Sequence, residues 1–109
     1  MSDSSMAEEF VKVASISEIP PDKMKVVQYK GQPVCLAYIA GNYYAIRNTC
    51  THMGGPLAQG KLDGRMVECP WHGSRFDLAT GEVKRGPAQT SEPVFEVKVE
   101  GTTLLIRPK

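Results

Sequence analysis

Both histidines of the chain stand beside a cysteine, in two short segments whose residue types are those of metal ligands. The segments read Cys50-Thr51-His52 and Cys69-Pro70-Trp71-His72, with sixteen residues between His52 and Cys69. Each segment therefore offers one thiolate and one imidazole. Four such ligands can hold one zinc ion in a tetrahedron, or they can hold a cluster of two irons.

The distribution of the ligand types separates these two possibilities. Zinc fingers place two cysteines in the first knuckle and two histidines in the second, whereas here the types are mixed within each segment. The mixed order suits a two-iron cluster, because each segment can send its cysteine to one iron and its histidine to the other. Structural zinc stays open as the weaker alternative.

The two segments resemble the cluster-binding boxes of the Rieske family. The matching residues are Cys50-Thr-His52-Met-Gly-Gly-Pro and Cys69-Pro-Trp-His72-Gly-Ser, at the separation usual for that family. The resemblance implies one [2Fe-2S] cluster, with Cys50 and Cys69 on an inner iron and His52 and His72 on an outer iron near the surface. It also implies an all-β fold, an antiparallel Rieske-like sandwich with a loop-rich cluster-binding subdomain.

The chain departs from one branch of this family at two positions. Rieske proteins of cytochrome bc complexes resemble it in ligands but carry an extra cysteine in each box, and the two form a disulfide that clamps the loops. Gly55 and Trp71 occupy those positions here. Loop closure is therefore expected to depend on packing by Pro56, Leu57, Pro70 and Trp71, as in ferredoxin and oxygenase members.

Two further residues are expected to act on the cluster from outside its ligand set. Ser74 matches a family hydrogen-bond donor to the cluster sulfurs, and Phe76 stands where high-potential members have a tyrosine. Each hydrogen bond stabilises the extra negative charge of the reduced state. Since Phe76 has no hydroxyl, the reduction potential is expected to lie below that of the bc-type proteins.

The third cysteine, Cys35, is not expected to be a ligand. It lies in the apolar run Val34–Ala40 and has no neighbouring metal motif. A buried thiol that behaves as a small hydrophobic residue is the expected role.

The elements that must position the ligands read as strands. Apolar and β-branched residues gather in six runs with Gly or Pro turns between most of them, and no run has sustained helical spacing. Asp63-Gly64 and Thr80-Gly81 predict two short hairpins around the site. The six predicted strands are Phe10–Ala14, Met24–Tyr29, Val34–Ile39, Tyr43–Arg47, Phe95–Glu100 and Thr103–Arg107.

Length and composition limit what else the chain can hold. With 109 residues we expect residues 10–109 to form a single Rieske domain with a cluster-binding insert at about 48–88, after a flexible tail of residues 1–9. A net charge of +1 does not indicate a basic surface for binding nucleic acid, and no apolar run is long enough for a membrane span. The polar start of the chain and its three cysteines favour a cytoplasmic protein.

These features predict an electron carrier and not an enzyme. Both histidines are assigned to the cluster, so none is left for a mononuclear iron site of two histidines and a carboxylate. The resemblance implies a monomer that passes single electrons from an NAD(P)H-dependent flavoprotein reductase to a terminal oxygenase. The alternatives are a small subunit of a larger redox enzyme, such as a nitrite reductase, and an interaction module stapled by zinc.

Overall fold

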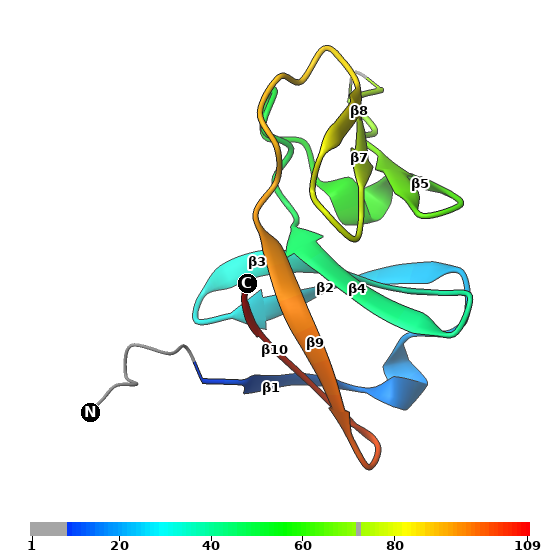
Figure 1. The fold of residues 1–109 in the computed structure, drawn as a ribbon, viewed down its shortest axis with the longest axis vertical. Coiled ribbons are helices and arrows are strands. Elements are labelled where there is room, and N and C mark those ends of the chain that lie inside the picture. The colour runs from blue at the N-terminus through cyan, green and yellow to red at the C-terminus, as the bar shows by residue number, and fades with distance from the viewer. Residues whose placement is uncertain (1–8, 72) are drawn as a thin grey trace.

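The polypeptide forms two antiparallel β-sheets, stacked along the long axis of the molecule (Figure 1). The computed structural model describes residues 9–71 and 73–109. Within these residues the only helices are two single 3-10 turns, η1 (Ile16–Glu18) and η2 (Leu57–Gln59). The all-β expectation is thus confirmed. No helix in this described part is long and apolar enough to cross a membrane.

The larger sheet contains all six strands that the sequence predicts. Its order places the first and last strands beside each other, where they pair. Lys30-Gly31 and Ala40-Gly41 both have positive φ, which gives the tight two-residue hairpins that match strand twist. In spatial order the strands are β1 (Val11–Ser15), β10 (Thr103–Pro108), β9 (Val94–Glu100), β4 (Asn42–Arg47), β3 (Gln32–Ile39) and β2 (Lys23–Tyr29).

The smaller sheet consists of two hairpins joined side by side. Their turns contain Asp63-Gly64 and Thr80-Gly81, so both predicted hairpins are present. The strands, in order, are β5 (Lys61–Asp63), β6 (Met66–Glu68), β7 (Arg75–Asp77) and β8 (Val83–Arg85). The connection between β6 and β7 contains the second cysteine–histidine segment.

Strand β3 lies between two hydrophobic cores. Val34 and Leu36 belong to a core on one face of the large sheet, whereas Cys35 and Ala37 belong to a core shared with η2 and the small sheet. All four are fully buried. Successive side chains of a strand point to opposite faces, so a strand buried on both faces reads as a continuous apolar run.

The site begins where β4 and β9 separate. These strands pair only at Ala45–Phe95 and Ile46–Val94, followed by one bond from the Arg47 N–H to the Pro93 carbonyl at 3.0 Å. Beyond that point residues 48–60 leave β4 and residues 86–93 arrive from β8, both passing through the upper end of the molecule (Figure 1). The short ladder therefore opens into two segments that frame the site.

Candidate metal centre

The two loops that carry the cysteines have the same backbone turn. The N–H of Cys50 donates to the Gly55 carbonyl and the N–H of Cys69 donates to the Ser74 carbonyl, each at 2.8 Å. Each cysteine carbonyl accepts from a glycine four residues on, Gly54 at 2.8 Å and Gly73 at 3.1 Å. Both glycines have positive φ, +81° and +78°, which favours glycine. The loops thus present their cysteines in equivalent ways.

Cys50 and Cys69 are close together and buried. Their exposures are 3% and 2%, and all three cysteines of the chain are free thiols. Burial raises the pKa of Cys50, and the hydrogen-bonded thiol of Cys69 raises it further. A buried thiol such as Cys50, whose pKa is raised, needs a cationic partner before it can be held as thiolate, and a bound metal would supply that charge.

Only one of the two histidines lies within the residues that the structure describes. His52 is exposed on the first loop, in accord with a ligand of an outer iron. His72 lies outside the residues that the structure describes. Within residues 9–71 and 73–109, no three Cys, His, Asp or Glu side chains group closely enough to hold one metal ion. The described donors, the buried thiols of Cys50 and Cys69 and the imidazole of His52, are of the types that ligate a two-iron cluster.

Gly55 and Trp71, the positions of the disulfide in the bc-type proteins, are adjacent in space. A Cβ on Gly55 would lie 2.8 Å from the Cys69 sulfur and 3.0 Å from the Trp71 ring. The first distance is shorter than real Cβ contacts and the second is tight, so a side chain at this position would displace the Cys69 sulfur or the indole. The indole packs over the Gly55 backbone and stays 55% exposed on its outer side.

The expected clamp of four packed side chains is only partly present. Leu57 is fully buried beneath the site, but Pro70 and Trp71 are exposed and Pro56 is half-buried. The other contacts that hold the two loops together are hydrogen bonds, which the sequence did not predict. Pro70 cannot contribute a backbone donor, and its ring lies at the loop surface.

Residues 85–93, which we name the strap, bond to both loops. The Ala88 N–H donates to Ser74 Oγ at 2.9 Å, and the Arg85 guanidinium donates to the Gly73 carbonyl at 2.9 and 3.1 Å. On the other loop, the Thr51 hydroxyl donates to the Thr90 carbonyl at 2.6 Å. The strap therefore links the two loops without a covalent bond.

Ser74 and Phe76 are both fully buried. Since Ser74 Oγ accepts the Ala88 N–H, its own hydroxyl proton remains able to donate to a further acceptor. Phe76 on β7 pairs with Val67 and packs in the core beneath the loops. The serine therefore has a hydroxyl that can donate, and the phenyl ring has none.

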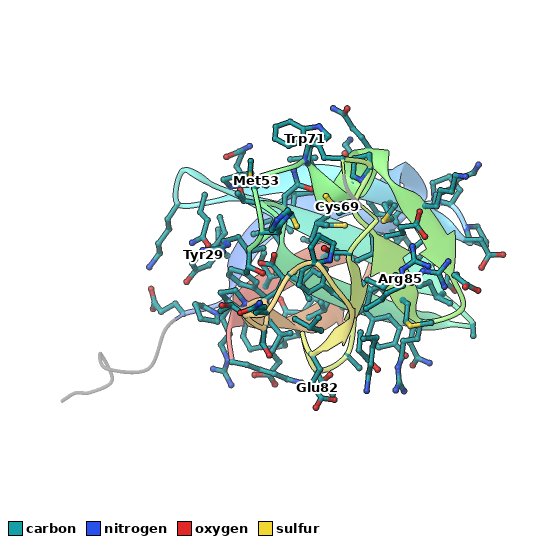
Figure 2. All side chains as sticks on the ribbon, turned by 90° about the horizontal axis from the view of Figure 1, so that it is seen from above. Tyr29, Met53, Cys69, Trp71, Glu82 and Arg85 are labelled. Carbon is teal, nitrogen blue, oxygen red and sulfur yellow. The ribbon has the colours of Figure 1, made fainter. Side chains whose placement is uncertain are left out.

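The second loop is supported by a ladder of ion pairs across the small sheet. Asp63, Glu68, Arg75 and Arg85 come from β5, β6, β7 and β8 in turn. Arg75 contacts Asp63 at 2.6 Å and Glu68 at 2.9 Å, while Arg85 contacts Glu68 at 3.3 Å. Figure 2 looks onto this end and shows Cys69 between Trp71 and Arg85. The ladder orients the guanidinium that holds Gly73.

The fold and the paired loops are those of one protein family. The Rieske [2Fe-2S] domain matches residues 9–103, and the chain belongs to this family. This membership assigns a 2Fe-2S cluster, and not a zinc ion, to the chain.

The relatives include ferredoxin components of oxygenase systems. The 2,4-dinitrotoluene dioxygenase system ferredoxin component of Burkholderia sp. (strain RASC) is 35% identical over 94% of this chain and 98% of its own. The ferredoxin of carbazole 1,9a-dioxygenase from Nocardioides aromaticivorans IC177 superposes with a TM-score of 0.87, at 30% identity over 92% and 98% of the two chains. A chain from a complex of reduced oxygenase and oxidized ferredoxin in carbazole 1,9a-dioxygenase is 33% identical, with a TM-score of 0.83 over 89% and 91%.

Proposed function

We propose that this protein is an electron carrier that holds one [2Fe-2S] cluster, ligated by Cys50, His52, Cys69 and His72. The observation that carries the proposal is the pair of equivalent loops that bring two free, buried thiols into contact. The bound cluster supplies one-electron redox chemistry. The chain itself is not an enzyme, because both histidines are used as ligands and no substrate-activating metal site remains.

The protein side chains would prepare the site in three ways. The turns fix the cysteine backbones, so the two thiols would be held side by side as ligands. Burial of the thiols excludes water from the inner iron, while the exposed His52 would bring the outer iron near the surface. Ser74 retains a hydroxyl proton that can stabilise charge on the cluster.

The partners that fit this function are an NAD(P)H-dependent flavoprotein reductase and a terminal oxygenase. Support comes from the relatives named as ferredoxin components of dioxygenase systems, and from the oxygenase–ferredoxin complex. Met53 and Trp71 expose 60% and 55% of their surface at the cluster end, and we propose that partners dock there. A carrier that meets two partners in turn at one face needs only to be a monomer. We propose that it works in the cytoplasm.

The same proposal covers the domain organisation. Residues 10–109 would form one Rieske domain with its cluster-binding insert at about 48–88, in accord with the family match to residues 9–103. The pairing of β1 with β10 supports a single unit, because the first and last strands complete one sheet. The tail at residues 1–9 falls almost wholly outside the described residues.

The test is the electron paramagnetic resonance spectrum of the dithionite-reduced protein, with iron and zinc measured on the same sample. We expect the low average g value of mixed histidine and cysteine ligation, with about two irons per chain. A spectrum without signal from a protein that contains stoichiometric zinc would refute the proposal.

Variants of the cysteines test the ligand assignment. Cys50→Ala and Cys69→Ala should each lose the cluster, because one iron would lack a thiolate ligand. Cys35→Ala is the matched control: this thiol is also buried, and burial together with the charge of Glu92 raises its pKa to about 12. Full cluster content in either ligand variant, or loss in the control alone, would contradict the assignment.

A further inference from the structure

A buried carboxylate lies behind the first cysteine loop and has no part in the ligand set. Glu92 is 3% exposed and its side chain is fully covered. Its partner is Arg47, whose Nε lies 3.3 Å from Glu92 Oε1. Neither carboxylate oxygen has a well-aligned hydrogen bond to any described residue. Burying a charged group in this way is costly unless it is fully paired.

The backbone fixes Glu92 in this position. Its N–H donates to the Gly81 carbonyl at 2.8 Å, and a Cβ on Gly81 would lie 2.1 Å from the Glu92 carbonyl oxygen. Two residues earlier, Thr90 accepts the Thr51 hydroxyl, and one residue later Pro93 accepts the Arg47 N–H. These contacts hold the carboxylate between the end of β4 and the first loop.

The carboxylate lies beside the backbone N–H of Thr51, the residue between two proposed ligands. Burial raises the pKa of Glu92 to about 7, and the Arg47 charge and the Thr51 N–H lower it from a still higher value. Thr51 stands between Cys50 and His52, so the charge lies close behind the cluster loop. The other titratable group that Glu92 influences is the Cys35 thiol of β3. Charges separated by protein are screened less than charges separated by water.

We propose that the buried Glu92–Arg47 pair sets the reduction potential of the cluster through its charges, an inference that rests on the proposed cluster site. Reduction adds one negative charge to the cluster. The Glu92 carboxylate opposes that charge and lowers the potential, whereas the Arg47 guanidinium favours it and raises the potential. Since Arg47 is 35% exposed and Glu92 is not exposed, water screens the arginine more. The carboxylate therefore dominates.

Voltammetry of single variants at pH 9, where Glu92 is charged, tests the pair. Glu92→Gln keeps the shape and removes the negative charge, so its potential should shift to a more positive value. Arg47→Gln should shift the potential in the opposite direction and by less. Glu96→Gln is the control, since Glu96 loses the same charge but is exposed and paired with Arg107 at 2.9 Å.

The pH profile separates an effect of charge from a change of packing. The offset between Glu92→Gln and the native protein should shrink as the pH falls below 7, because native Glu92 then binds a proton and loses its charge. A packing change would give an offset that does not vary with pH. An intact cluster spectrum with no offset at pH 9, or with a constant one, overturns the inference and leaves the proposed function standing. A native protein without a cluster would instead refute the proposed function.

Discussion

Ser74 shows how one buried side chain can serve both structure and redox chemistry. Its oxygen accepts the Ala88 N–H of the strap. Under the proposed function its hydroxyl proton would bond to the cluster, which would couple the strap and the reduction potential through one atom. A residue with only one of these roles could be replaced without loss of the other, but Ser74 cannot.

Replacing this serine tests both roles. Ser74→Ala should lower the reduction potential, because one hydrogen bond to the reduced state is lost. It should also destabilise the protein by about 1–3 kcal/mol, since the buried Ala88 N–H loses its acceptor. Voltammetry and thermal unfolding are the measurements, and Ser91→Ala, at an exposed strap position, is the control. An unchanged potential would mean that the hydroxyl points elsewhere.

Phe76 leads to a prediction about the native potential. The side chain is fully buried on β7 and has no hydroxyl, so it offers no hydrogen bond to a cysteine ligand. We expect the native potential to lie below that of disulfide-clamped Rieske proteins of cytochrome bc complexes, measured by voltammetry under the same conditions. A value equal to theirs would show that another donor replaces the tyrosine.

At the scale of elements, the strap and the ion-pair ladder together determine the position of the second loop. Arg85 belongs to both, because it ends β8, contacts Glu68 and donates twice to the Gly73 carbonyl. An exposed ion pair alone contributes little to stability. The contact with a loop carbonyl gives Arg85 more effect than its exposure suggests.

Removing this guanidinium should loosen the second loop. Arg85→Gln is expected to lower the temperature of cluster loss by a few degrees, since about one net hydrogen bond is removed from the loop. The measurement is the loss of visible absorbance on heating. Lys84→Gln is the control, because Lys84 lies on the same strand and its ion pair, at 3.3 Å, is with exposed Glu82 and not with a cysteine loop. If both variants lowered the temperature of cluster loss equally, the cause would be the lost positive charge and not the contact with Gly73.

Local sequence patterns predicted where the strands lie better than they predicted which strands pair. The alternation of Phe95, Val97 and Val99 and the two hairpin turns each depend on a few neighbouring residues, and the structure contains those elements. The pairing of β1 with β10 and of β6 with β7 joins residues distant in sequence or separated by a loop. No local pattern encodes such pairing.

Within the site, the donor types could be predicted and the supports could not. Cys50 and Cys69 follow from motif spacing, and the structure brings their thiols together. The strap was missed because its bonds use the Thr90 carbonyl, which any residue could provide, and the Ala88 N–H, which any residue except proline could provide. Glu92 was missed because a lone glutamate in a loop reads as a solvated residue.

The whole molecule is elongated, with its principal extents at 41, 30 and 21 Å. The two loops lie at one end of the long axis, above the six-stranded sheet (Figure 1). Among described residues, the exposed large hydrophobic side chains are Met53, Trp71 and Val99, and the first two lie at the loop end. With a net charge of only +1, long-range attraction would contribute little to docking, so the proposed docking at this end would depend on direct contact.

Surface variants at the two ends test this docking. Met53→Ser should slow electron transfer to the oxygenase several-fold with the cluster spectrum unchanged, because an apolar contact is lost. Val99→Ser, near the far end of β9, should have no effect although its exposure is similar at 49%. Stopped-flow oxidation of the reduced carrier is the measurement. Equal rates for both variants and the native protein would place the docking surface elsewhere.

The contact between Gly55 and Trp71 has one more consequence. A loop clamp made from a disulfide can itself be opened by thiol reagents, whereas packing and hydrogen bonds contain no bond that a reductant can break. Millimolar dithiothreitol should therefore leave this protein's cluster in place. A reductant that delivers electrons to the cluster would therefore leave the clamp between the two loops closed.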